Sequence, residues 1–193
     1  MIAIVSYQAT WEAEFRQLGR HLRHHLGDLA LRIDHIGSTA IPGLAAKDII
    51  DIQITARALT PTLEHALNRA GYHRVSHITQ DHLPPGTNAP AQEWLKWFFT
   101  PSAGQRPVNL HIRMPGQANQ RYALLFRDYL RACPPIAHAY GQVKMALAHH
   151  HAGGGWDEME AYYEVKDPLC DIIRGGAEVW AAWHGWEIGP TDC

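Results

Sequence analysis

Two periods of hydrophobicity divide the chain into a first part rich in predicted strands and a second part rich in predicted helices. Apolar residues three to four apart predict an amphipathic helix over about residues 8–26. Over residues 49–55 the alternation is strict, which predicts a strand with its isoleucines on one face and its polar side chains on the other. Similar patterns predict strands over 31–36, 72–78, 94–100 and 108–114, and a helix over 61–70.

From Gln117 onward, apolar residues recur at helical spacing. They predict helices over 119–131 and 136–149 and a third from about residue 157. Pro168 and Gly175-Gly176 are predicted to interrupt this last helix, because proline and glycine disfavour helix interiors. Strands followed by helices are typical of α+β proteins. We therefore predict a single α+β domain over 1–193, in which a helical part (117–193) packs on a sheet-containing core (1–116).

The composition excludes several classes of function. Charged residues make up 19% of the 193 residues and the formal net charge is −2, which gives no extended basic surface for long nucleic acid. The three cysteines are far apart in the sequence, which favours a reducing compartment over a disulfide scaffold. No apolar run approaches the roughly 20 residues of a membrane helix. The first residues also lack the basic segment of a signal peptide, so we expect a cytoplasmic protein with no membrane partner.

Histidine is frequent, with 14 residues in the chain. Three of them fall within residues 21–25, and another three form the run 149–151. Consecutive residues of a helix point about 100° apart, so such a run does not converge on one metal ion. We interpret both groups as solvated parts of helices.

The segment that carries the candidate chemistry runs from residue 34 to residue 54. Its first strand is predicted to end at Gly37-Ser38, where the missing side chain of glycine and the serine hydroxyl let a phosphate approach the backbone. Asp51 follows on the next strand, where a carboxylate can bind Mg²⁺ that bridges to phosphates. A Gly-Ser pair alone occurs in many turns. The acid among isoleucines a dozen residues later makes the pattern more specific, so we predict phosphate or nucleotide contact at Gly37 and Ser38.

Several short motifs follow one another along the chain: His-Ile-Gly-Ser-Thr-Ala-Ile-Pro-Gly-Leu-Ala-Ala-Lys (35–47), Ile-Asp-Ile (50–52), Leu-His-Ile (110–112), Phe-Arg-Asp-Tyr-Leu-Arg (126–131), Tyr140 with Lys144, and Tyr162 or Tyr163 with Lys166. With these motifs the chain resembles the GrpB family, an offshoot of the nucleotidyltransferase superfamily that also occurs fused to some dephospho-CoA kinases. The resemblance covers nearly the whole chain in the family's order. It implies a nucleotidyltransferase-like small mixed sheet flanked by helices, with a C-terminal helical extension.

The acidic positions depart from the nucleotidyltransferase pattern. In that superfamily the Gly-Ser is followed by two acids one residue apart and by a third acid on a neighbouring strand, and together these acids hold two metal ions. Asp51 matches the first acid, but Gln53 stands at the second position, and the third strand offers Asn109 and His111. These residues are compatible with a site that holds a single Mg²⁺ and with a phosphate site that holds no metal.

Basic residues of the predicted C-terminal helices complete the candidate site by closing a cationic wall over an anionic ligand. The candidate catalytic residues are Asp51 and His111, the candidate phosphate-binding residues are Gly37, Ser38, Lys47, Arg127, Tyr140, Lys144 and Lys166, and the candidate metal ligands are Asp51 and Gln53. Structural alternatives stand beside these roles. Lys47 would neutralise Asp51, His111 would be a satisfied strand histidine, and the helical residues would form an ordinary exposed face.

Two functions fit these residues. As an enzyme, the protein would bind a nucleoside triphosphate and transfer a nucleotidyl or phosphoryl group to a small acceptor, with Lys144 and Lys166 stabilising the developing charge. As a binding or accessory protein, it would hold a nucleotide or CoA-like ligand without catalytic metals. Gln53 favours the second function, because an intact pair of acids would be the plainest mark of the first.

Overall fold

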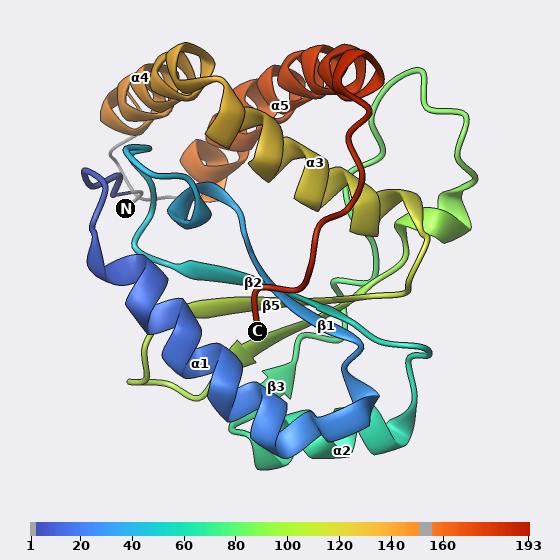
Figure 1. The fold of residues 1–193 in the computed structure, drawn as a ribbon. Helices are drawn as coiled ribbons and strands as arrows, with labels where there is room; N and C mark the ends of the chain where they lie inside the picture. Colours follow the sequence, from blue (N-terminus) through green and yellow to red (C-terminus); the bar gives the residue numbers. More distant parts are fainter. Residues whose placement is uncertain (1–2, 151–155) are drawn as a thin grey trace.

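A mixed five-stranded sheet forms the middle layer of the structure, with helices on both of its faces (Figure 1). The computed structural model describes residues 3–150 and 156–193, without the side chains of 156–159. The end of the histidine run, His151, therefore lies outside the described residues. The strands are β1 (Arg32–Ile36), β2 (Ile50–Thr55), β3 (Tyr72–Arg74), β4 (Trp97–Pro101) and β5 (Val108–Arg113). The helices are α1 (Thr10–Leu26), α2 (Pro61–Arg69), α3 (Ala118–Ala132), α4 (Pro134–His150) and α5 (Trp156–His184), with short 3-10 turns η1 (Gly27–Leu29), η2 (Ser38–Ala40) and η3 (Ala91–Trp94).

The strand order across the sheet is β1-β2-β5-β4-β3. β2 and β5 run parallel at the centre, whereas the other neighbouring pairs are antiparallel. The register places Asp51 opposite Asn109 and Gln53 opposite His111. Because successive side chains of a strand point to opposite faces, these four polar side chains share one face and the isoleucines of β2 share the other.

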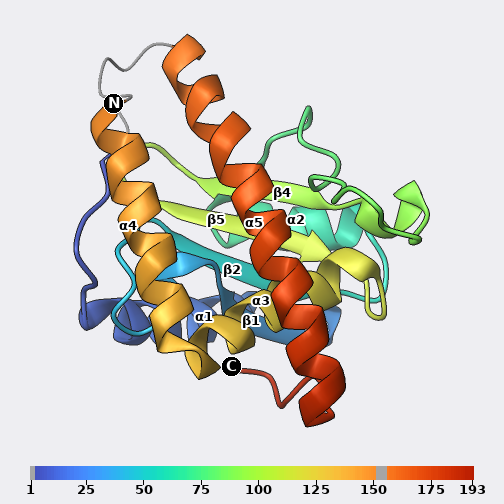
Figure 2. The same ribbon diagram turned by 90° about the horizontal axis from the view of Figure 1, so that it is seen from above.

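Two apolar cores lie on opposite sides of the sheet. α1 and α2 cover the apolar face, where Trp11, Phe15 and Leu67 pack with the isoleucines of β2. On the other side, α3, α4 and α5 pack on one another through side chains that include Leu125 and Ala177. Figure 2 shows α4 and α5 running over this face of the sheet. The polar residues of β2 and β5 therefore lie under the helical part, and the predicted α+β class is confirmed.

Two of the predicted strands are longer than the observed ones. β3 ends at Arg74 rather than at residue 78, because the chain turns after Val75, whose N–H donates to Phe98 O at 2.8 Å. β4 begins at Trp97 rather than at residue 94, because Trp94 ends η3. Trp94 is nevertheless buried. The hydrophobic pattern thus indicated its burial correctly and its backbone conformation wrongly.

The predicted interruption of the last helix is also wrong. α5 continues through Pro168 and both glycines from Trp156 to His184. A proline in a helix costs about 3 kcal/mol, and the packing of buried α5 side chains against α3 and α4 offsets this cost. Gly176 serves as a contact rather than a break, because a Cβ there would lie 2.9 Å from Tyr129 Oη.

Alanine substitutions at the two glycines of α5 are expected to differ. Gly175→Ala should raise the free energy of unfolding by about 0.5–1 kcal/mol, because nothing lies within 4 Å of the added methyl group and alanine is the better helix former. Gly176→Ala gains the same propensity but must displace the Tyr129 hydroxyl, so we expect no gain or a loss of about 1 kcal/mol. Urea unfolding measures both values. Equal stabilisation would show that the contact with Tyr129 adapts freely.

Candidate functional site

A cavity of about 420 Å³ lies between the polar face of the sheet and the helices α4 and α5. Asp51 of β2 and Asn109 and His111 of β5 form its floor, and Phe98 of β4 lies against the His111 ring. Ser38, the first residue of η2, lines its wall. The fold thus brings Ser38, Asp51 and His111, three of the predicted site residues, together with Asn109.

All four lysines of the chain line this cavity, namely Lys47, Lys96, Lys144 and Lys166. None of the arginines, all of which are described, is among its lining residues. Lysines normally spread over the exposed surface of a protein. Their gathering here makes the cavity, which we call the lysine cavity, the main concentration of ammonium groups in the molecule.

Lys144 is the most buried of these lysines, with an exposed fraction of 2%. Its Nζ donates to Ser38 Oγ at 2.8 Å and to Ala45 O at 2.6 Å, and lies 4.5 Å from the centre of the Tyr140 ring. Burial lowers the pKa of Lys144 to about 7, and the charge of Lys166 acts in the same direction. Near neutral pH the amine is therefore present in both protonation states.

Lys47 and Lys166 lie beside the tyrosines of α5. Lys47 Nζ donates to Tyr163 Oη at 3.1 Å and lies 4.8 Å from the centre of the Tyr163 ring. Lys166 Nζ lies 3.4 Å from Asp167 Oδ1. Burial opposes the charge of Lys166, but Cys170 and Asp167 outweigh it and raise the pKa of this lysine, which stays cationic.

Asp51 is held in place by the polar residues of β5. Its Oδ1 accepts a hydrogen bond from Asn109 Nδ2 at 2.8 Å, and His111 Nε2 lies 3.8 Å from the same oxygen. Burial opposes ionisation, but His111 and Asn109 outweigh it and lower the pKa of Asp51. Burial also lowers the pKa of His111 to about 4, so the imidazole is neutral at neutral pH.

Gly37 lets the turn after β1 pass directly over Asp51. Its φ is +68°, in the left-handed region, and a Cβ at this position would lie 2.8 Å from Cβ and Cγ of Asp51. Only glycine combines this conformation with so close an approach. The turn thereby places the Ser38 hydroxyl in the lysine cavity next to Lys144.

A second compartment of about 270 Å³ adjoins the lysine cavity and shares Ser38, Asp51 and His111 with it. Four aromatic side chains line it, Trp94, Tyr122, Phe126 and Tyr140, alongside charged residues that include Arg113. We call it the aromatic compartment. The predicted residue Tyr140 lies in this aromatic compartment, whereas Lys166 lines both. The two compartments together offer a cationic half and an aromatic half to one ligand.

Gln53 shares the polar face of the sheet, but the structure does not bring it to the cavity. Its side chain is fully buried, its Oε1 accepts from Arg113 Nη1 at 2.5 Å, and its Nε2 donates to Gln120 O at 3.2 Å. The amide at the second acidic position therefore connects β2 to β5 and α3.

Sequence reasoning missed Asp81 and Lys96. Lys96 Nζ donates to Asp81 Oδ1 at 2.7 Å and lies 3.3 Å from His111 Nδ1. Arg113 donates to both oxygens of Asp81 at 2.8 and 2.9 Å. Lys96 and Phe98 are two residues apart, which is the spacing of side chains on one face of a strand. This spacing could have placed Lys96 on the polar face of the sheet. Asp81 lies in an irregular segment, so no pattern pointed to it.

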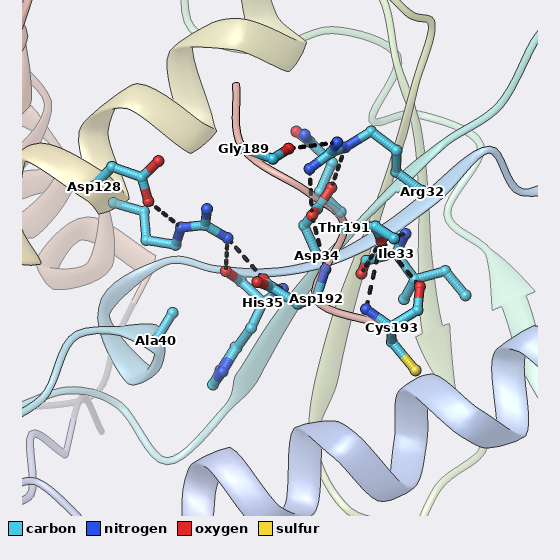
Figure 3. Close-up of polar contacts among 12 residues, drawn as sticks. Arg32, Ile33, Asp34, His35, Ala40, Asp128, Gly189, Thr191, Asp192 and Cys193 are labelled. Atoms are coloured by element: carbon cyan, nitrogen blue, oxygen red, sulfur yellow. Dashed lines mark hydrogen bonds and ion pairs between the residues drawn. The ribbon is translucent and has the colours of Figure 1, made fainter. Parts of the chain in front are cut away.

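Arg127 lies away from both compartments. Its hydrogen-bond partners Asp128, His35 and Asp192 are labelled in Figure 3, which shows the C-terminal residues running along β1. Its Nε donates to Asp128 Oδ1 at 2.7 Å. Its Nη1 donates to Asp192 Oδ2 at 2.7 Å and to His35 O at 3.1 Å. Arg127 therefore joins α3, β1 and the C-terminal segment, and it is not placed to contact a ligand in the lysine cavity.

The donors around Asp51 do not fit a resident two-metal centre of the kind that the nucleotidyltransferase resemblance implies. Such a centre needs several oxygen ligands. Asp51 is joined at the cavity by Asp81 and Asp167. Asp81 already accepts from Lys96 and Arg113, and Asp167 is paired with Lys166. Among the residues described, no group of three or more His, Cys, Asp or Glu side chains converges. The side chains of the cavity itself therefore supply its chemistry.

Comparison with known proteins places this chain among relatives of one family. The sequence profile described as GrpB protein matches residues 1–174. A curated relative from Mycolicibacterium paratuberculosis, named dephospho-CoA kinase, is 36% identical over 96% of this chain. The UPF0157 protein SCO7215 of Streptomyces coelicolor is 33% identical, over 91% of this chain and 84% of that protein. The chain spans about half the length of the dephospho-CoA kinase relatives, 48% in the first case.

A solved structure shares the fold over nearly the whole chain. The crystal structure of the conserved protein GrpB from Enterococcus faecalis superposes with a TM-score of 0.73 at 27% identity, covering 92% of this chain and 99% of that one. Within the described part of the chain, no helix has the length and apolar character needed to cross a membrane.

Proposed function

The chain belongs to the GrpB family, and we propose that its lysine cavity binds a phosphorylated small molecule, for which a nucleotide is the best candidate. The observation that carries this proposal is the convergence of all four lysines on one cavity. Ammonium groups are compact donors suited to phosphate oxygens. Lys47, Lys144 and Lys166 would contact the phosphates, together with the hydroxyl of Ser38.

The aromatic compartment favours a nucleotide over a simple phosphate. It adjoins the lysine cavity and presents the rings of Trp94, Tyr122 and Phe126 to a flat apolar group. Ligand pockets typically combine such apolar walls with a few polar groups that fix orientation. A base in the aromatic compartment and phosphates among the lysines would fill both halves with one molecule.

The side chains around Asp51 support binding of the phosphorylated ligand without a metal ion. Lys96 and Arg113 engage Asp81, one of the two carboxylates beside His111. The lysines supply the positive charge that Mg²⁺ would otherwise bring to the phosphates. The name of the longer relatives concerns proteins of about twice this length, and for this chain it only recommends dephospho-CoA as a second ligand to test.

Isothermal titration calorimetry with ATP and with dephospho-CoA tests the proposal. We expect binding in EDTA as well as in Mg²⁺. Lys47→Gln and Lys166→Gln should each weaken it about ten-fold, since a charge-assisted hydrogen bond is worth about 1.5–3 kcal/mol. Arg57→Gln, an exposed residue outside the cavity, is the matched control and should leave the affinity unchanged. No binding of either ligand in either buffer would contradict the proposal.

Asp51→Asn separates metal-independent from metal-dependent binding. The amide keeps the shape of the side chain and removes a negative charge from the cavity floor. We expect it to leave nucleotide affinity in EDTA equal or stronger, because the phosphates then meet less repulsion. A loss of affinity seen only when Mg²⁺ is present would show instead that Asp51 holds the cation.

A further inference from the structure

Ser38 and Lys144 form a buried hydroxyl–amine pair within the lysine cavity. Their Oγ and Nζ atoms are 2.8 Å apart, and the turn at Gly37 and helix α4 bring them together. Nζ is also 2.6 Å from Ala45 O, which can only accept a proton. A neutral amine in this position donates one N–H to Ala45 O, so its lone pair is available to the hydroxyl proton of Ser38.

The surroundings of Lys144 favour the neutral form of its amine near neutral pH. Burial lowers the pKa of Lys144 to about 7. The groups that face it are Lys166 and Lys47, which lower this pKa further, and Cys170 and Asp51, which raise it. The Tyr140 ring lies 4.5 Å from Nζ and stabilises the cation once it forms. A base that titrates near neutral pH is well matched to taking up and returning a proton.

We propose that Ser38 is a nucleophile and Lys144 its general base, so that the lysine cavity forms a covalent adduct between Ser38 Oγ and the phosphorus of a phosphoanhydride ligand. The inference rests on the proposed function and adds a reaction to it. A nucleophilic hydroxyl beside a positioned base, within a cavity that binds the electrophile, is the arrangement that covalent catalysis requires. The reaction needs no metal, in keeping with the donor set around Asp51.

In the proposed step, the Ser38 Oγ–P bond forms while the bond from phosphorus to the bridging oxygen of the anhydride breaks. The hydroxyl proton passes to Nζ of Lys144. The leaving group takes the electron pair of the broken bond, and the charges of Lys47 and Lys166 stabilise it. It is pyrophosphate when a nucleotidyl group is transferred and a nucleoside diphosphate when the terminal phosphoryl group is transferred. Attack of an acceptor hydroxyl on the same phosphorus then breaks the Oγ–P bond, with the Lys144 proton returning to Oγ and the acceptor proton passing to water.

A small fluorophosphonate tests the nucleophile without knowledge of the natural ligand. We expect one adduct per chain, mapped to Ser38 by peptide mass spectrometry, with a rate that rises with pH through about 7, where Lys144 loses its proton. Ser38→Ala should abolish the adduct, and Lys144→Met should slow it about 100-fold. Ser102, whose Oγ lies 3.0 Å from His73 Nε2 outside the cavity, is the matched control. Its alanine variant should label normally, and labelling of the wild type at Ser102 rather than Ser38 would overturn the proposal.

Lys144→Arg distinguishes a base from a structural anchor. Arginine keeps the positive charge and the hydrogen-bond donors but does not lose its proton in proteins. We expect a folded protein, judged by its unfolding midpoint, that labels as slowly as Lys144→Met. Labelling of Lys144→Arg at the wild-type rate would overturn the role of Lys144. NMR of ¹³Cε-lysine gives an independent readout, because four lysines give only four signals to titrate. A Lys144 signal that titrates like an exposed lysine would contradict the proposal.

Incubation with ATP in EDTA tests the reaction itself and separates this inference from the proposed function. We expect the mass of the protein to increase by one nucleotidyl or phosphoryl group at Ser38. Calorimetric binding without labelling of Ser38 by either reagent would defeat the nucleophile and leave the proposed ligand class standing. Labelling by the fluorophosphonate without any nucleotide binding would support the reactive pair and defeat the ligand class.

Discussion

Replacing Gly37 with alanine is expected to lower the free energy of unfolding by about 3 kcal/mol. Two costs combine at this position. A residue with a Cβ at φ +68° pays about 1–2 kcal/mol of backbone strain. The added methyl group would also lie 2.8 Å from Cβ and Cγ of Asp51 and closer still to Oδ2, and overpacking of this kind costs about 1–3 kcal/mol. Urea unfolding followed by circular dichroism measures the loss.

Gly43→Ala is the matched control for this prediction. Gly43 has a φ of +78°, but nothing lies within 4 Å of its hypothetical Cβ. The backbone strain is therefore present without the contact, and we expect a loss of about 1 kcal/mol. Equal losses in the two variants would show that the turn shifts away from Asp51 at no cost. In that case the close approach of Gly37 would not explain the position of Ser38.

The central strands could be predicted from the sequence because their pattern depends on a local rule. Side chains of a strand alternate between two faces, so residues 51 and 53 share one face of β2 and residues 109 and 111 share one face of β5. The pairing of Asp51 with Asn109 puts these polar residues on the same side of the sheet. The α+β class followed in the same way, from the change of period near residue 117.

Features that depend on contacts between distant segments could not be predicted in this way. The break expected at Pro168 and Gly175-Gly176 does not form, because α5 packs along α3 and Gly176 makes room for Tyr129. Gln53 has the right spacing from Asp51 but is held by Arg113. Neither the helix partner nor the hydrogen-bond partner can be read from local periodicity.

The positions of the lysines at the candidate site also depend on contacts between distant segments. Lys47, Lys144 and Lys166 were identified through resemblance to a family, whereas Lys96 was missed, and only the fold shows that all four share one cavity. Arg127 matched the family equally well, but its guanidinium binds Asp128 and Asp192 outside the cavity. A family match therefore indicates that a residue matters in the fold or at the site, and three-dimensional placement decides between the two.

Replacing Asp81 with asparagine is expected to lower the free energy of unfolding by about 3–5 kcal/mol. Asp81 accepts hydrogen bonds from Lys96 at 2.7 Å and from Arg113 at 2.8 and 2.9 Å. Both cations are buried, with exposed fractions of 8% and 5%. Asparagine has nearly the same shape but no charge, so it leaves the two cations without compensation, and breaking a buried ion pair costs about this much. Chemical unfolding at neutral pH measures the effect.

The pH dependence of stability gives this prediction a second test. Burial acts to raise the pKa of Asp81, but Arg113 and Lys96 outweigh it and hold this pKa well below its ordinary value of 3.8. A carboxyl with a depressed pKa in the folded state stabilises fully above its unfolded pKa, and the contribution falls as pH drops from there through the folded pKa. The gap in stability between wild type and Asp81→Asn should therefore be constant near neutral pH and shrink below about pH 4.

Glu64→Gln is the control, because the Glu64–Arg74 pair is 3.4 Å long and partly exposed, and its loss should change stability by no more than about 0.5 kcal/mol. A gap that stays constant down to acid pH would show that Asp81 does not carry the charge that compensates Lys96 and Arg113.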